Sequence, residues 1–489
     1  MTGALRIHPA DNVLVALRDL NEGETALGVR LTQRVPAGHK AALAPIASGE
    51  RVIKYGSPIG VATADIPAGA WVHTHNVKTL LSGELTYPYR PLLPAAPAAS
   101  DAAFSGYPRR DGRVGIRNEV WIIPTVGCVS RTAEAAAERA RALFGDRVDG
   151  IYAFPHVHGC SQMGDDQENT QRTLAAPVNH PNAGAALVMG LGCENNCIDR
   201  FRPFVGDQPE GRVRYVNCQD EPDEIESALR RLDALTRHAA EFRRQPCPID
   251  RLVVGLKCGG SDGFSGITAN PLLGALSDHL CGLGATALLT EVPEMFGAEH
   301  LLIERCADRA AFDQVVEMVN GFKRYFARHG QPCSENPSPG NKAGGITTLE
   351  DKSLGCVQKG GHVPVVGALP IGQAARGPGL LLVDGPGNDL VACTALAAAG
   401  AQLVLFTTGR GTPYGGPVPT LKISTNSALA GRKPGWIDFD AGRLAQGEPM
   451  ETLLREFVDL VLDTAGGRPA KNEVSGYREI AIFKDGVTM

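Results

Sequence analysis

RLVVGLKCGGSDGFSGITANP, residues 251–271, begins as an apolar run and breaks at Cys258 into glycine, serine and aspartate. A short apolar run that ends in this way is typical of a strand buried in a parallel sheet. Five glycines stand among the twelve residues from Gly255 to Gly266, and glycine allows a backbone to approach another group closely. The stretch therefore predicts a buried strand that delivers a glycine-rich loop to a binding site.

The same pattern recurs from about residue 110 onward, where apolar runs alternate with helix-like segments such as SRTAEAAAERARALF (130–144). This alternation predicts an α/β fold with parallel strands. Ligands of open α/β sheets bind outside the carboxyl ends of the strands, so the residues that end each apolar run are candidates for a site. They are Cys128, His156, Cys160, Cys193, Cys218, Cys258, Glu291, Asp384, Asp389, Arg410 and Thr412.

The first eighty residues have a different pattern, in which short β-like runs are interrupted by glycine. A small repeat, VPAG (35–38), IASG (46–49) and IPAG (66–69), closes a turn before each new run. This pattern predicts a compact β domain rich in hairpins. The segment YPYRPLLPAAPAASDAAFSG (87–106) follows it, and its proline and alanine content is typical of an extended linker.

The overall composition excludes some classes of partner. The 489-residue chain has a formal net charge of −5, which gives no reason to expect a nucleic acid or an anionic membrane as partner. The first residues lack the layout of a signal peptide, and the longest apolar stretch (390–406) is too short to cross a bilayer and predicts a helix, a turn and a buried strand. We therefore expect a cytoplasmic protein whose twelve cysteines are reduced thiols.

Thiols at the ends of five predicted strands suggest a metal site, because soft thiolates bind iron–sulfur clusters, zinc or copper. A single buried cysteine is more commonly a small core residue, but five in similar positions favour a ligand role. No paired Cys-x-x-Cys is present, which disfavours a structural zinc ribbon. We interpret the remaining cysteines in helix-like or loop contexts as structural: Cys247, Cys281, Cys306, Cys333, Cys356 and Cys393.

Other candidates come from loops that are rich in glycine. The chain has neither a phosphate-binding loop nor a dinucleotide fingerprint, so no nucleotide cofactor is expected. NPSPGNKAGG (336–345) is predicted to be irregular, and Lys342 beside Asn341 is either a base in a pocket or a solvated loop lysine. Arg410 suits a bidentate contact with a substrate carboxylate; the alternative is a surface ion pair.

At this point the chain resembles the altronate/galactarate dehydratase family of sugar-acid hydro-lyases along nearly its whole length. The segments that carry the resemblance include GHKAAL, VIKYGSPIG, GCSQMGDDQENT, GLGCENN, CGGSDGFSGITANP, TEVPEMFGAEHLL, NPSPGNKAGGITTLEDKSLGC and TGRGTPYGG. VHTHN, EVPEMFGAE and GITTLEDKSLGC are more similar to the altronate branch than to the galactarate branch.

The resemblance implies a SAF-type β-clip domain (1–85), a linker (86–106), a middle α/β domain (107–246) and a C-terminal Rossmann-like catalytic domain with a parallel sheet (247–489). It also implies a homodimer and an iron-dependent dehydration of a sugar acid without nucleotide. The expected reaction removes the C2 proton of D-altronate and expels its C3 hydroxyl, giving 2-keto-3-deoxy-D-gluconate. Galactarate or another sugar acid is the alternative substrate, and a non-enzymatic sugar-acid-binding protein or a nicotinamide-dependent dehydrogenase is the alternative class.

The candidate site follows from these expectations. A base of near-neutral pKa and a Lewis acid would meet the needs of the reaction. The iron is expected either as a single ferrous ion held by carboxylate and imidazole or as a 4Fe–4S cluster with one open iron. The candidate catalytic residues are Lys342, His156 and Glu291; the candidate substrate-binding residues are Ser261, Asp262, Asn270, Asn341, Arg410 and Thr412; the candidate iron ligands are Cys128, Cys160, Cys193 and Cys258.

Overall fold

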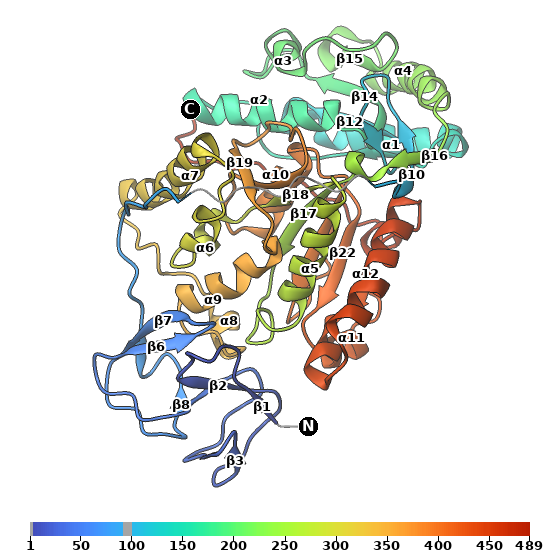
Figure 1. Cartoon of the computed structure of the whole chain (residues 1–489). Helices are drawn as coiled ribbons and strands as arrows, with labels where there is room; N and C mark the ends of the chain where they lie inside the picture. The colour runs from blue at the N-terminus through green and yellow to red at the C-terminus, as the bar shows by residue number, and fades with distance from the viewer. Residues whose placement is uncertain (1–2, 91–99) are drawn as a thin grey trace.

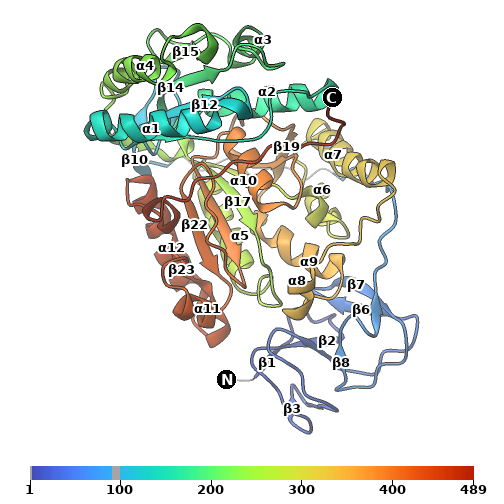
Figure 2. The ribbon, with the colours of Figure 1, turned by 180° about the vertical axis from the view of Figure 1, so that it is seen from behind.

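The structure is a computed structural model that describes residues 3–90 and 100–489. The chain forms three regions, with the β domain at one end, the middle domain at the other and the C-terminal domain between them (Figures 1 and 2). Residues 91–99 of the expected linker lie outside the described residues. Within the described part of the chain, no helix is long and apolar enough to cross a membrane.

The β domain consists of short antiparallel strands that are separated by turns. Gly38, Gly49 and Gly69 of the sequence repeat have φ of 79°, 87° and 81°, a left-handed backbone that favours glycine. Each of them precedes a strand by one or two residues, as the repeat predicts. The strands form sheets in the orders β1(Ala4–Leu5)-β2(Val13–Ala16)-β5(Lys40–Ala42)-β8(Trp71–Val72), β6(Arg51–Lys54)-β7(Ser57–Ala62)-β9(Val77–Lys78) and β3(Thr25–Ala26)-β4(Val29–Arg30).

The middle domain is built on a parallel sheet of four strands with helices on both faces. The strand order is β13(Gly150–Ala153)-β12(Glu119–Pro124)-β14(Ala183–Gly190)-β15(Val213–Asn217). Helices α1(Ser130–Phe144) and α4(Glu224–Ala239) cover one face; α2(Gly164–Asn179) and α3(Ile198–Val205) cover the other. A small antiparallel sheet, β11(Val114–Gly115)-β10(Ala103–Pro108)-β16(Gln245–Pro248), connects this domain to the next one.

The C-terminal domain contains a sheet of seven strands, and every pair of neighbours in it is parallel. This confirms the predicted α/β class with a parallel sheet behind an N-terminal β domain. The order is β19(Val365–Leu369)-β20(Gly379–Val383)-β18(Thr286–Leu289)-β17(Val253–Cys258)-β21(Leu403–Thr408)-β22(Thr420–Ser424)-β23(Phe439–Asp440). The opening stretch of the sequence thus supplies the central strand, β17.

Helices bury both faces of this sheet, which is why its strands are apolar throughout. Side chains of α5(Ala269–Gly282), α7(Arg309–Arg328) and α12(Met450–Ala465) share a core with Val254 and Leu256 of β17. On the opposite face α10(Asp389–Ala398) packs between the sheet and α2 of the middle domain. The remaining helices are α6(His300–Ile303), α8(Pro339–Ala343), α9(Leu349–Cys356), α11(Ser427–Arg432) and α13(Lys471–Val474).

The β domain packs against the loops at the carboxyl ends of the large sheet. Gly38 lies so close to Gly263 that a β-carbon on Gly263 would stand 1.9 Å from the Gly38 carbonyl oxygen. The ammonium groups of Lys40 and Lys54 donate to the two carboxylate oxygens of Asp351 in α9 at 2.8 and 2.9 Å, and all three side chains are buried. These contacts fix the β domain over the region where the strands of an α/β sheet present their ligand site.

One local expectation was wrong. NPSPGNKAGG is not irregular throughout, because residues 339–343 form helix α8. Pro339 occupies the first turn of the helix, where its missing N–H costs nothing. Ser338 and Asn341 form a reciprocal capping box, which stabilises a short helix start.

Candidate active site

A cavity of about 690 Å³ opens at the carboxyl end of β17. The glycine-rich loops after β17 and β21, the segment before α8, and the start of α10 form its walls. Its lining consists of polar and charged residues with glycines between them: Cys258, Gly259, Gly260, Glu294, Glu335, Asn336, Ser338, Gly340, Asn341, Lys352, Gly387, Asp389, Arg410 and Gly411.

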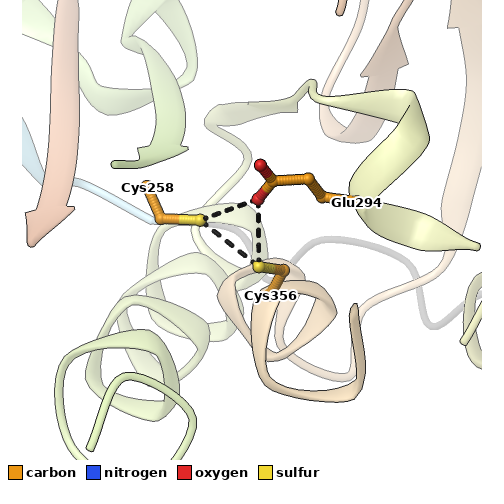
Figure 3. A group of neighbouring side chains, drawn as sticks. All are labelled: Cys258, Glu294 and Cys356. Carbon is orange, nitrogen blue, oxygen red and sulfur yellow. Dashed lines mark hydrogen bonds between the residues drawn. The ribbon is translucent and has the colours of Figure 1, made fainter. Parts of the chain in front are cut away.

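Two thiols and a carboxylate, those of Cys258, Cys356 and Glu294, converge on one another (Figure 3), and Cys258 and Glu294 also line the cavity. The Sγ atoms of Cys258, at the end of β17, and Cys356, at the end of α9, are 3.4 Å apart. Glu294 Oε2 lies 3.5 Å from Cys258 Sγ and 3.3 Å from Cys356 Sγ. All three residues are buried, and their ligand atoms lie within 4.8 Å of one another. Within residues 3–90 and 100–489, this is the single group of three such side chains at that spacing.

Three buried lysines surround the thiols and carboxylates. Lys352 Nζ donates to Glu294 Oε1 at 2.8 Å, and Lys359 Nζ donates to Cys258 Sγ at 2.8 Å. Lys257 Nζ pairs with Glu291 and, at 2.9 Å, with Asp389. The three ammonium groups thus balance the carboxylates of Glu291, Glu294 and Asp389, which keeps the buried cluster neutral as long as both thiols hold their protons.

The lysines also control the protonation of the cluster. Burial by itself would raise the pKa of Glu294, but the charges of Lys352, Lys257 and Lys359 lower it to about 2. Burial would lower the pKa of Lys352, and Glu294 instead raises it above its usual value. The hydrogen bond to Cys258 and burial raise the pKa of the Cys356 thiol well above its usual value. At neutral pH the Glu294 carboxylate is therefore ionised, the Lys352 amine is protonated and the Cys356 thiol is protonated.

Glu291, a predicted catalytic residue, lies behind the cluster and organises it. Its carboxylate accepts from Lys359 Nζ at 3.0 Å and from the Cys258 backbone N–H at 3.0 Å, and it also pairs with Lys257. Its φ of 71° is a left-handed conformation that is costly for a non-glycine residue and is concentrated at functional sites. Glu291 is not among the residues that line the cavity as far as the structure describes the chain.

Two of the predicted substrate-binding residues line the cavity. Arg410 is exposed, and its Nη1 donates to the Gly340 carbonyl at 3.3 Å. Asn341 is buried; its Nδ2 donates to the Ser261 carbonyl at 2.8 Å, and its Oδ1 accepts from Lys352 at 3.3 Å. Arg410 is therefore free to bind an anion, whereas Asn341 links the α8 segment to the glycine-rich loop and to Lys352.

Of the other predicted substrate-binding residues, Asp262, Asn270 and Thr412 use their polar groups in contacts within the protein. The Asp262 carboxylate accepts from Thr425 at 2.9 Å, from Ser265 at 3.1 Å and from Asn426 at 3.1 Å. Asn270 donates to the Gly355 carbonyl and accepts from Thr407. Ser261 Oγ is buried without a hydrogen-bond partner in the described structure. Thr412 lies in the loop after β21, where its hydroxyl accepts from the Tyr414 N–H.

The structure does not bring the four predicted iron ligands to one sheet edge. Cys128, Cys160 and Cys193 are exposed and follow strands of the middle sheet, whereas Cys258 is buried at the end of a strand of the seven-stranded sheet. The expectation of one shared edge assumed a single sheet, but the apolar runs are divided between two sheets.

Two of the predicted acid–base residues also lie apart from the cavity lining. His156 is in the middle domain, where one ring nitrogen bonds the Pro124 carbonyl at 2.8 Å and the other accepts from the His158 N–H. Burial lowers the pKa of His156 to about 4. Lys342 is half-buried in α8 and is not among the cavity-lining residues of the described chain.

Sequence reasoning missed Glu294 and Cys356 of the thiol–carboxylate cluster, as well as the lysines around it. Cys356 was interpreted as structural because its context is helix-like or loop-like, but the structure places its sulfur against Cys258. Glu294, Lys352 and Lys359 lie within or next to the segments TEVPEMFGAEHLL and NPSPGNKAGGITTLEDKSLGC. The charged residues of these two segments were the available signal.

A cavity at the carboxyl ends of parallel strands, with ionised acid–base groups, a thiol and an arginine that has no ion pair in the described structure, is the arrangement expected of an α/β enzyme that acts on a small polar acid. Comparisons with known families identify it further. Residues 249–488 match the D-galactarate/Altronate dehydratase C-terminal model, 106–240 match the D-galactarate dehydratase/Altronate hydrolase second-domain model, and 2–80 match the altronate/galactarate dehydratase SAF domain. The chain belongs to the altronate/galactarate dehydratase family, which confirms the predicted family and hydro-lyase class.

Three characterised relatives are similar over nearly their entire length. The altronate dehydratase of Escherichia coli (strain K12) is 53% identical over 99% of both chains. The altronate dehydratase of Bacillus subtilis (strain 168) is 48% identical over 100% of both chains. The galactarate dehydratase (L-threo-forming) of Escherichia coli is 34% identical over 98% of this chain and 96% of its own.

Proposed function

We propose that the protein dehydrates D-altronate to 2-keto-3-deoxy-D-gluconate. The observation that carries this proposal is the full-length similarity to two altronate dehydratases at 53% and 48% identity, against 34% for the galactarate dehydratase. The cavity supports it, because Arg410 can bind one carboxylate while Asn336, Ser338 and Asp389 offer partners for hydroxyl groups.

The reaction needs one group that removes a proton from the substrate and another that donates a proton to the leaving hydroxyl. A base takes the C2 proton, the electron pair of that bond forms the C2–C3 double bond, and the C3 hydroxyl leaves as water after it receives a proton. The resulting enol tautomerises to the 2-keto-3-deoxy acid. Lys352 lines the cavity as an ammonium group and is suited to donate the proton. Asp389 is our choice for the base, because its side chain is 34% exposed at the cavity, whereas the Glu294 side chain is 4% exposed and contacts both thiols.

We also propose that Cys258, Glu294 and Cys356 hold the iron that the family resemblance implies. Two soft sulfur atoms and one carboxylate within 4.8 Å form a suitable ligand set, and Cys258 and Glu294 also face the cavity. Two thiolates would compensate the charge of one divalent cation inside an otherwise neutral cluster. When bound, iron would supply a Lewis acid at the wall of the cavity. The alternative, a 4Fe–4S cluster held by Cys128, Cys160 and Cys193, stays a separate prediction.

The proposed activity is tested with purified protein, ferrous iron and a thiol reductant, without nicotinamide nucleotide. We expect a keto-deoxy acid from D-altronate with a kcat/KM that exceeds the value for galactarate. Fast turnover of galactarate with none of altronate would reassign the substrate, and turnover of neither acid would favour a sugar-acid-binding protein.

The homodimer is a proposal that rests on the family resemblance, and the cytoplasmic location is a proposal that rests on the sequence composition. Light scattering after size-exclusion chromatography would measure the mass of the assembly against the 51.6 kDa of one chain. A mass of one chain across micromolar concentrations would exclude the dimer. Fractionation of the source cells would test the location.

A further inference from the structure

Five charged side chains line the cavity, and three of them are neutralised by a neighbour. Lys352 and Glu294 pair with each other at 2.8 Å, and Asp389 pairs with Lys257 at 2.9 Å. The remaining two are Arg410 and Glu335, neither of which has an oppositely charged partner within 4.0 Å in the described structure. Both are exposed. The cavity thus offers a bound acid one free positive charge and one free negative charge.

The two free charges are associated with opposite ends of one wall. The segment 335–341 forms this wall. At its start Asn336, next to Glu335, donates to Glu294 at 3.3 Å. Near its end Gly340 accepts from Arg410 at 3.3 Å. A sugar acid whose carboxylate binds Arg410 and whose carbon chain follows this wall would extend toward Glu335 and the thiol–carboxylate cluster.

This arrangement distinguishes two kinds of sugar acid. An aldonate such as altronate has one carboxylate and ends in a neutral hydroxymethyl group, whereas an aldarate such as galactarate has a carboxylate at each end. The second carboxylate of an aldarate would face Glu335, and juxtaposed like charges disfavour a competing ligand. A hydroxymethyl group there can instead donate a hydrogen bond to the carboxylate.

We propose that Glu335 is a specificity-determining residue that makes this cavity selective for sugar acids with a single carboxylate. The inference rests on the proposed dehydratase function, and it adds the residue that sets the substrate class. In the proposed mechanism Glu335 acts on substrate binding and takes no part in the bond-breaking steps.

The test compares kcat/KM for D-altronate and galactarate in the iron-loaded wild type, Glu335→Gln and Glu335→Lys. The galactarate-to-altronate ratio should rise about tenfold in Glu335→Gln, as expected when one solvent-screened repulsion is lost, and further in Glu335→Lys. The effect should appear mainly in the KM for galactarate, because the lost repulsion acts on binding of the second carboxylate. The wild-type preference should also shrink as ionic strength rises, because salt screens exposed charges.

Glu304→Gln is the matched control, because Glu304 is an exposed carboxylate that does not line the cavity; its ratio should equal that of the wild type. An unchanged ratio in both Glu335 variants, in an enzyme that dehydrates altronate, would overturn the inference and leave the proposed function standing. A wild type that does not dehydrate altronate would instead overturn the proposed function.

Discussion

Cys258 and Cys356 are 98 positions apart in the chain, yet their sulfur atoms lie 3.4 Å from each other. Neither residue is informative alone, since a single buried cysteine is most often a core residue. Their chemical character comes from the side chains around them, namely a lysine that donates to Cys258 and a carboxylate that contacts both sulfurs. At the scale of the residue, the site is defined by partners rather than by residue types.

The first prediction concerns these thiols. Cys258→Ser and Cys356→Ser should each remove most of the iron from anaerobically reconstituted protein, because a hydroxyl is a much poorer ligand than a thiolate for a soft metal. Iron per chain is measured by elemental analysis, and Co²⁺ substitution gives a second signal through sulfur-to-metal absorption. Cys306→Ser and Cys393→Ser serve as controls at buried cysteines outside the cluster. Full iron content in both cluster variants, with loss in Cys128→Ser, Cys160→Ser and Cys193→Ser, would place the iron in the middle domain.

At the scale of the element, helix α9 (Leu349–Cys356) connects the β domain to the site. Glu350 accepts from Thr79 and from the Leu80 backbone, and Asp351 accepts from Lys40 and Lys54. The next residue of the helix is Lys352, which reaches Glu294 at 2.8 Å. Consecutive positions on a helix point in different directions, so one short helix bonds the β domain on one side and supplies two site residues on the other.

The second prediction tests this helix. Asp351→Asn should destabilise the protein by about 3–5 kcal/mol, because it leaves two buried lysines without a countercharge. Urea unfolding measures the change in the free energy of unfolding, and Asp313→Asn, in an exposed pair with Arg309, should cost less than about 1 kcal/mol. A loss of under about 1 kcal/mol in Asp351→Asn would contradict the buried-charge argument.

The pH dependence of Asp351 has a defined sign. Burial by itself would raise the pKa of Asp351, but Lys40 and Lys54 hold it well below its usual value. The carboxylate therefore contributes stability that is fully present above the unfolded pKa of about 4 and is lost as the pH falls toward the folded pKa. As the pH falls below about 4, the free energy of unfolding should therefore decrease less steeply in Asp351→Asn than in the wild type.

At the scale of the whole molecule, a buried network of charges joins the middle domain to the C-terminal domain. Arg478 Nη2 pairs with Glu119, at the start of β12, at 2.8 Å and with Glu473 of α13 at 3.0 Å. Arg117 pairs with the same Glu473 at 2.8 Å. The last residues of the chain then return to the middle domain, where the Asp485 and Gly486 N–H groups donate to Asp166. The two α/β domains are therefore connected by polar contacts as well as by the core that α2 and α10 share.

The third prediction belongs to this scale. Arg478→Met should cost about 3–5 kcal/mol, because it leaves the Glu119 carboxylate buried without its cation. Hydrogen exchange should speed up on both sides of the junction, in β12 and in residues 477–482, since the change acts on the contact between domains. Arg455→Met, at an exposed arginine without an ion pair in the described structure, should change neither measurement. Faster hydrogen exchange in one domain alone would contradict the inference that Arg478 couples the two domains.

Local patterns in the sequence determined much of the architecture. SRTAEAAAERARALF is helix α1 from its first residue to its last, and the apolar stretch 390–406 is a helix, a turn and a buried strand. The glycine repeat marks left-handed turns at the predicted positions. These features depend on neighbours within a few residues, on periodicity and on allowed φ values, and so a single sequence contains them.

The site depended on contacts that only the tertiary structure forms. Arg410 and Cys258 were predicted at the cavity and line it, but Asp262 and Asn270, from the same glycine-rich segment, are bonded within the core by Thr425 and Thr407. Glu294 and Cys356 belong to the site only because two segments that are distant in the sequence pack against β17. A polar side chain binds whichever partner the fold brings within about 3 Å, and that partner stood 98 positions away for Cys258, 137 for Asn270 and 163 for Asp262. The sequence by itself therefore determined the elements and the edge of the sheet that carries the site, and packing decided which polar groups remain free to act there.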